Sequence, residues 1–206
     1  MINNYDLAFR QNSRRYKDGD KLLLHVCCAP CATYCLTRLI EKFDVTLYYA
    51  NDNIVDYDEW QKRLGQVQKL VDIVNNGQFE VQPKFPLKLV VQPFNNSKFF
   101  AVAKGLENYN EGGPRCKQCF KLRFQQTLNY AKDNGFDYFG TTLTVSRHKN
   151  SKLINEIGLA LQGQVKWLVA DFKKHNGFDE SLRLAEKYNL YRQDYCGCSF
   201  SNWHNQ

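Results

Sequence analysis

The chain has 206 residues, a formal charge of +7 and eight cysteines. Its length allows one domain over residues 1–206 with a substantial core, and no apolar run approaches the roughly 20 residues of a membrane span, which excludes a transmembrane protein. The polar N-terminus carries no secretory signal, so we expect a cytoplasmic protein, in which many cysteines indicate metal binding or thiol chemistry rather than disulfides. The charge, the twelve Tyr and the fourteen Phe suit a nucleic-acid partner, although such a charge is equally common on proteins that bind none.

The first part of the chain predicts an arm, a strand, a turn and a helix. Residues 1–20 are polar and basic, and we expect them to form a basic N-terminal surface arm with little core. The apolar run over residues 22–26 predicts a buried parallel strand, and Pro30 begins a helix with apolar residues at three- and four-residue steps. Cys27 and Cys28 therefore lie in a strand-to-helix turn, where helix amides stabilise thiolates.

The rest of the chain continues this alternation of strands and helices. Further strands are expected at 44–50, 87–91, 136–142 and 165–170. Further helices are expected at about 57–75, 99–106, 116–134, 151–162 and 179–188. The alternation predicts an α/β fold, with an open, largely parallel sheet and helices on both faces. Ligands in such folds bind beyond the carboxyl ends of the strands, so the polar turns at those ends are the candidate site.

Six cysteines form three pairs with the spacing of metal ligands. They are Cys27 and Cys28, the C-x-x-C of Cys116 and Cys119, and the C-x-C of Cys196 and Cys198 in a tail expected over residues 195–206. A C-x-x-C brings two thiolates to one side of a helical turn, so it chelates metal well. Structural zinc is one explanation, but six thiols exceed what one tetrahedral zinc needs. The excess favours a four-iron cluster with either a second metal or redox-active thiols.

Three further residues near the first turn are weaker candidates. Cys35 lies on the apolar stripe of its helix, so we expect it to pack in the core. Cys31 is ambiguous between ligand and core. His25 lies inside the apolar strand, where a hydrogen-bonded core histidine is favoured over a metal ligand.

Two polar turns at strand ends have both a functional and an ordinary interpretation. The first turn contains Thr141, Thr142, Ser146 and Lys149. The second turn contains Asp171, Lys173 and Lys174. Side chains and helix amides in such turns can hold phosphate, and a solvated loop is the alternative in both cases.

An ordered set of motifs over residues 22–199 resembles the cobalamin-independent epoxyqueuosine reductases. The motifs are Cys27-Cys28-x-x-Cys31, the Tyr48-Tyr49 strand leading to Asn53-Ile54, Arg63, Arg115-Cys116-x-x-Cys119-Phe120-x-x-Arg123, Gly140-Thr141-Thr142-Leu143 with Ser146 to Asn150, Ala170 to Lys174, and Tyr195-Cys196-Gly197-Cys198. The resemblance implies a Rossmann-like domain related to the nucleotide-hydrolase-like HUP folds. It also implies a [4Fe-4S] cluster, a second metal ion expected to be iron, and a tRNA with a GUN anticodon that carries epoxyqueuosine at the wobble position.

The implied reaction removes the epoxide oxygen with two electrons and two protons and gives queuosine, the last step of its biosynthesis; the electron donor is unidentified. The six paired cysteines are assigned to metal, without dividing them between the two centres. Asp171 is the candidate catalytic residue. Three roles are open to it: a proton donor, an outer-shell group that contacts the metal ligands, or a contact to substrate hydroxyls. The candidates for substrate binding, with Tyr49 as a stacking surface and the basic residues as phosphate contacts, are Tyr49, Asn51, Asn53, Arg63, Arg115, Arg123, Thr141, Thr142, Ser146, Lys149, Lys173 and Lys174.

One residue departs from the family pattern, and two other functions are alternatives. Asp52 stands where the family commonly has a proline, a change that affects substrate contacts in this turn and no metal ligand. A zinc-stabilised tRNA-binding module without catalysis is one alternative. An ATP-dependent tRNA-thiolating enzyme of related fold is the other, but no Ser-Gly-Gly-type phosphate loop follows the first strand.

Overall fold

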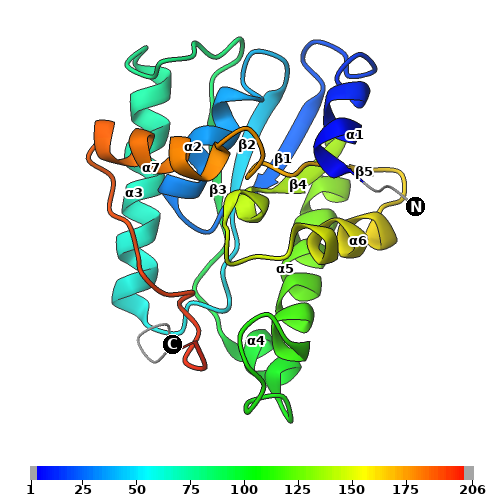
Figure 1. Cartoon of the computed structure of the whole chain (residues 1–206), viewed down its shortest axis with the longest axis vertical. Coiled ribbons are helices and arrows are strands. Elements are labelled where there is room, and N and C mark those ends of the chain that lie inside the picture. Colours follow the sequence, from blue (N-terminus) through cyan, green and yellow to red (C-terminus); the bar gives the residue numbers. More distant parts are fainter. Residues whose placement is uncertain (1–3, 202–206) are drawn as a thin grey trace.

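The computed structural model describes residues 4–201, in which strands and helices alternate along the chain (Figure 1). The strands are β1 (Lys21–His25), β2 (Asp44–Tyr49), β3 (Lys88–Val91), β4 (Tyr138–Thr141) and β5 (Lys166–Trp167). The helices are α1 (Tyr5–Asn12), α2 (Ala29–Thr37), α3 (Tyr57–Asn75), α4 (Ser97–Ala103), α5 (Pro114–Asp133), α6 (Ser151–Leu161) and α7 (Gly177–Lys187), with a short 3-10 helix η1 (Thr142–Val145). Within residues 4–201, every helix is too short or too polar to cross a bilayer.

The five strands form one parallel sheet in the order β3-β2-β1-β4-β5. In the centre, Leu24 of β1 lies opposite Leu47 of β2 and Gly140 of β4. Along the chain, β2 and β3 are added on one side of β1, and β4 and β5 are then added on its other side. The strand order therefore reverses between β1 and β4. This confirms the predicted fold class, and the switch between β1 and β4 is where such sheets place their ligands.

Both faces of the sheet are covered by helices. Leu22 and Leu24 of β1 pack into a core with α2, α3 and α7, whereas Leu23 points to the opposite core with α5 and α6. Alternate side chains of a strand point to opposite faces, so a strand buried on both sides needs the unbroken apolar run found in the sequence. The sheet is the middle layer of three.

The N-terminal segment is a folded part of the domain, which corrects the expectation of an arm with little core. Helix α1 begins after Asn4, whose side chain accepts a hydrogen bond from the backbone N–H of Leu7. Phe9 and Tyr16 are buried in the main core, and the rings of Phe9 and Phe172 lie 5.7 Å apart. Two aromatic side chains therefore anchor a segment whose composition is mostly polar.

Candidate metal centre

The turn after β1 brings three thiols together. The Sγ atoms of Cys27, Cys28 and Cys31 all lie within 4.8 Å of one another, and we call them the first thiol group. Cys27 and Cys28 lie in the turn, and Cys31 lies in the first turn of α2. The structure therefore places Cys31, which the sequence left ambiguous, beside the two predicted ligands.

Cys35, one helical turn after Cys31, has a different environment. Its side chain is fully buried in the core, and its thiol donates a hydrogen bond to the backbone carbonyl of Cys31 over 3.2 Å. This confirms the prediction that Cys35 packs as a small apolar residue.

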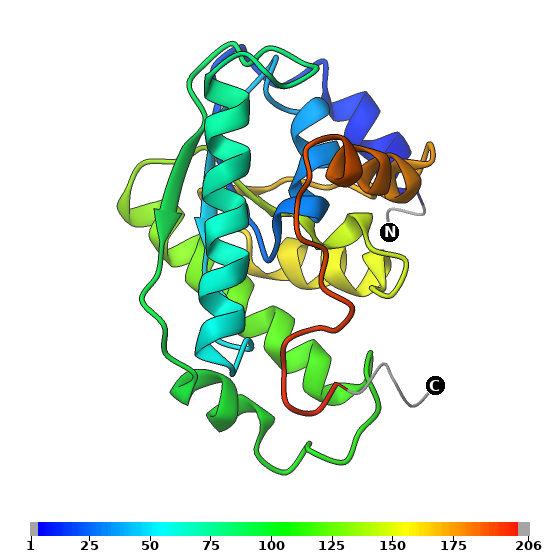
Figure 2. The ribbon, with the colours of Figure 1, turned by 90° about the vertical axis from the view of Figure 1, so that its left-hand side faces the viewer.

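A second thiol group forms where the segment after α7 reaches α5. Figure 2 shows this segment running as extended chain from α7 toward α4 and the start of α5. It places Cys198 in one small cluster with Cys119, and it brings Cys196 within electrostatic range of Cys116 and Cys119 at the start of α5. The C-x-C pair lies near the strand ends, where Asn53 after β2 donates to the carbonyl of Cys196 over 3.4 Å. Residues 202–206 of the expected tail lie outside the described residues.

Each thiol group contains one cysteine whose pKa is lowered. Hydrogen bonds from Cys28 and Cys31 hold the pKa of Cys27 well below its usual range. A hydrogen bond from Cys198, followed by the charge of Lys149, lowers the pKa of Cys196 to about 5. The ammonium of Lys149 is buried 3.5 Å from the Cys196 sulfur and also pairs with Glu111. Because metals bind thiolates, both groups are suited to hold metal.

Three arginines predicted to contact the substrate are buried, each at most 2% exposed. Arg63 pairs with Glu59 over 2.6 Å and donates to the carbonyl of Cys196. Arg115 donates to backbone carbonyls of the loop before α5 and to that of Phe200. Arg123 contacts side chains beside both thiol groups. We expected these arginines to lie at the rim and to contact the phosphates of the anticodon backbone. The structure corrects this expectation, because their guanidinium groups are buried and already bonded to other groups of the protein.

His25 links Arg123 to the strand ends. The Nε–H of Arg123 donates to Nε2 of His25 over 3.1 Å, so this nitrogen carries no proton, and Nδ1–H must donate to Oγ1 of Thr141, 2.9 Å away. Burial and then the charge of Arg123 lower the pKa of His25 to about 3. His25 is the neutral, hydrogen-bonded core histidine that the sequence predicts, and it belongs to the wall of the metal centre.

Other predicted substrate contacts also lie inside the protein. Tyr49 is fully buried and its hydroxyl donates to the carbonyl of Trp60, so it offers no stacking surface, contrary to expectation. Thr142 is fully buried, and Asn51 holds the carbonyl of Val26. A strand covered on both faces buries its last residues as well as its middle ones, which explains these corrections.

The predicted residues of the second polar turn lie apart from the thiols. Asp171 accepts hydrogen bonds from Ser151 and Lys173, each over 2.9 Å. With Lys174 it lines a separate, very small cavity against α1. These contacts of Asp171, Lys173 and Lys174 lie near the rim of the sheet, and none of them involves a cysteine.

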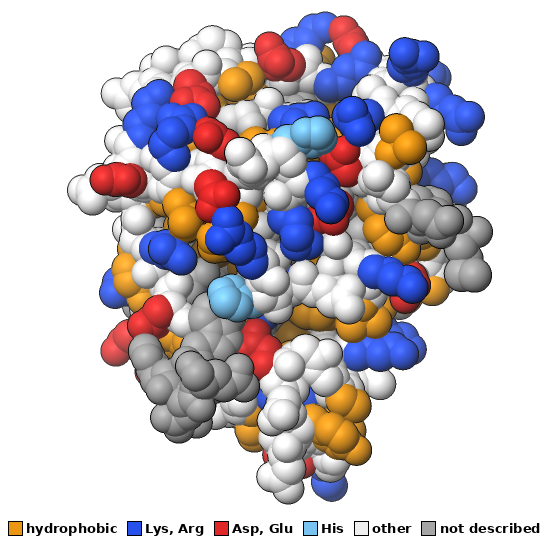
Figure 3. Space-filling model, in the orientation of Figure 1, with side chains coloured by type: hydrophobic (Ala, Val, Ile, Leu, Met, Phe, Trp, Pro, Cys, Tyr) orange, Lys and Arg blue, Asp and Glu red, His pale blue; other side chains and the backbone are white. Residues whose placement is uncertain are grey.

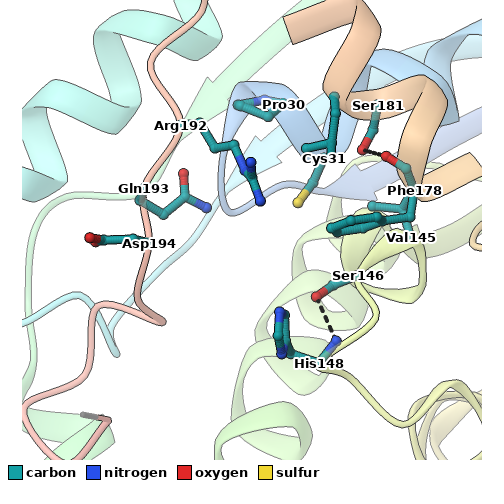
Figure 4. A pocket seen from close by; sticks show the side chains of 11 residues that line it. Pro30, Cys31, Val145, Ser146, His148, Phe178, Ser181, Arg192, Gln193 and Asp194 are labelled. Carbon is teal, nitrogen blue, oxygen red and sulfur yellow. Dashed lines mark hydrogen bonds between the residues drawn. The ribbon is translucent and has the colours of Figure 1, made fainter. Parts of the chain in front are cut away.

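A cavity of about 320 Å³ opens beside the first thiol group. The Cys31 sulfur and the side chains of Arg192 and Gln193 point into it, with Ser146 and His148 below (Figure 4). The sequence motifs include Ser146 and His148, but the sequence analysis missed Arg192 and Gln193. Their one sequence signal was position, since 192–194 directly precede the Tyr-Cys-x-Cys motif.

The face that carries this cavity is basic. Figure 3 shows Lys and Arg side chains spread over its upper and middle parts, with Asp and Glu side chains among them. Arg147, next to Ser146, is more than half exposed and pairs with Asp179. A polyanion approaching the cavity would therefore meet positive charge first.

Comparisons with known proteins agree with the geometry. The family model described as "Epoxyqueuosine reductase QueH" matches residues 22–204. Relatives named epoxyqueuosine reductase QueH include proteins of Streptococcus pyogenes, 37% identical over 96% of this chain and 78% of the relative, and of Staphylococcus epidermidis, 38% identical over 96% and 84%. A relative of that name from Thermotoga maritima is 30% identical over 87% of this chain and 89% of its own length.

Proposed function

Because the chain belongs to the epoxyqueuosine reductase QueH family of oxidoreductases, we propose that it removes the epoxide oxygen of epoxyqueuosine in tRNA to give queuosine. The reaction consumes two electrons and two protons, forms the alkene and releases the oxygen as water. The observation that carries the proposal is the presence of two thiol groups near the carboxyl end of the sheet, the first of them beside a cavity. Family membership favours this reaction over a non-catalytic zinc module and over tRNA thiolation.

The number and spacing of the thiols suggest which thiol group binds the cluster and which binds the second metal ion. The second thiol group offers four cysteines, the number that a [4Fe-4S] cluster takes, and we assign that cluster to it. The first offers three closely spaced thiols, which suit one metal ion with an open coordination position, and we assign iron there. When bound, the cluster supplies electrons singly and the open metal position polarises the departing oxygen. Two low thiol pKa values and the buried cations Arg123 and Lys149 fit bound groups of negative charge.

The cavity beside Cys31 is where we place the modified nucleoside. Its volume of about 320 Å³ is at the small end of ligand pockets, so it suits one extruded nucleoside rather than a base-paired stem. Arg192 and Gln193 can donate hydrogen bonds to the hydroxyls and the epoxide oxygen, and the Phe178 ring on the cavity wall can contact the apolar ring. These residues orient the substrate toward the first thiol group.

Side chains at the rim of the sheet are proposed to supply the protons and to contact the tRNA backbone. His148 lines the cavity and its imidazole can donate a proton there, so we propose it as the proton source in place of Asp171. Asp171 keeps the role of fixing Lys173 and Ser151 on the rim. The GUN anticodon backbone would cross the basic face of Figure 3.

The experiment that tests this function is anaerobic purification of the whole chain, followed by iron, sulfide and zinc analysis and assay on tRNA. We expect brown protein with broad visible absorption from iron–sulfur charge transfer, and conversion of epoxyqueuosine to queuosine when a chemical reductant is added. The product is measured as the nucleoside after digestion of the tRNA. Colourless protein with stoichiometric zinc and no turnover would favour the zinc-stabilised module instead.

A further inference from the structure

Arg123 is a buried cation without a carboxylate partner among residues 4–201. It lies on α5 one helical turn after Cys119 and is 2% exposed. Its side chain donates hydrogen bonds to His25, Asn51 and Cys119, at 3.1, 2.8 and 4.0 Å. The other two buried arginines differ, because Arg63 pairs with Glu59 and Arg115 is surrounded by backbone carbonyls.

The partners of Arg123 leave its charge uncompensated. Asn51 accepts through its carbonyl oxygen and is neutral. His25 accepts through Nε2 and donates through Nδ1 to Thr141, a pattern that only the neutral imidazole can make. A charge removed from water is costly unless an opposite charge lies near it. The groups that can supply this charge are thiolates.

Both thiol groups face this guanidinium. Cys119 and Cys196 of the second group and Cys27 of the first interact electrostatically with Arg123, and they raise its pKa although burial opposes the charge. The guanidinium thus contacts the second group through Cys119 and lies within electrostatic range of Cys27 in the first group. An arginine stays charged at any working pH, so this positive charge is permanent.

We propose that Arg123 is a positioning residue that places one fixed positive charge near both metal-binding thiol groups and so favours the reduced state of the cluster. The inference rests on the proposed iron–sulfur function. One-electron reduction adds one negative charge to a thiolate-bound cluster. A cation held nearby in a buried site stabilises that added charge and raises the reduction potential.

The test compares Arg123→Gln, which removes the charge, with Arg123→Lys, which keeps it. The matched control is Arg183→Gln, which removes an exposed arginine on α7 that pairs with Glu80 and Glu180. Each whole chain is prepared anaerobically with its cluster, its iron and sulfide are counted, and its potential is measured by dye-mediated titration with electron paramagnetic resonance.

For Arg123→Gln we expect the equilibrium constant for reduction to fall at least tenfold, which is a shift of about 59 mV to lower potential for one electron. Arg123→Lys should stay closer to the wild-type chain, and Arg183→Gln should match it. Should Arg123→Gln fail to hold the cluster, retention by Arg123→Lys supports the role of the charge, whereas loss in both variants overturns it. A fully loaded Arg123→Gln chain with the wild-type potential also overturns it. A wild-type chain that binds no cluster would refute the proposed cofactor and this inference together, while the other outcomes leave the reductase function standing.

Discussion

Cys31 and Cys35 lie one turn apart on α2, and replacing each by alanine should have opposite effects. Cys31 lies in the first thiol group with its sulfur toward the cavity, so Cys31→Ala should lose about one metal ion per chain and most of the turnover. Cys35 is fully buried in the core and belongs to neither group. Cys35→Ala should therefore keep both metal and turnover.

The cost of Cys35→Ala follows from its burial. Removing one buried sulfur takes away about as much apolar contact as one methylene, about 0.8 kcal/mol, and the small cavity left behind adds to this. We expect a loss of about 1 kcal/mol in the free energy of unfolding. In a domain of this size that lowers the melting temperature by about 2–4 °C.

The assay measures iron and sulfide per chain, the melting temperature and the queuosine formed in tRNA for both variants. Cys31→Ala with wild-type iron and turnover would leave the first group with two ligands and refute its assignment. Cys35→Ala with lost iron would show that burial in the core does not separate structural from ligating cysteines here.

Three other predictions concern stability and RNA binding. Gly158→Ala should lower the free energy of unfolding, measured by thermal unfolding, by about 1–3 kcal/mol, because its Cβ would lie 2.0 Å from the Trp167 ring. Gly65→Ala, with nothing within 4 Å of the added Cβ, should raise it by about 0.5–1 kcal/mol, and equal effects of the two variants would contradict the packing. Phe9→Ala should cost about 3–5 kcal/mol if α1 is part of the core, and a loss below about 1 kcal/mol would restore the idea of a loose arm. Binding of tRNA, measured by filter retention, should weaken steeply with salt, and binding that is insensitive to salt would argue against a phosphate-contacting surface.

The strands were predictable from the sequence because their pattern is local. The run at 22–26 has no polar residue except His25, and a strand covered on both faces needs such a run. The spacing of Cys31 and Cys35 was only partly informative. Residues four apart share a face of a helix, yet Cys31 lies at the helix start beside the turn, where its sulfur meets Cys27 instead of the core.

The buried arginines were not predictable from residue type, because guanidinium groups are rarely buried. Arg123 follows Cys119 and precedes Thr127 at four-residue steps, and all three lie on the buried face of α5. Arg63 similarly lies between Trp60 and Val67 on the buried stripe of α3. The helical period therefore contained the signal, but the charge suggested the opposite face. What compensates each charge depends on residues far away in the chain, which no local pattern gives.

The segment after α7 joins the second thiol group without any helix or strand of its own. Cys196 and Cys198 meet Cys116 and Cys119 only after β4, α6, β5 and α7 have been placed between them. A metal bound there closes a loop that contains this whole half of the fold, and the entropy lost by the unfolded chain grows with the length of such a loop. Metal bound at the second thiol group should therefore stabilise the fold more through chain closure than metal bound at the first group, whose three cysteines are neighbours in the sequence.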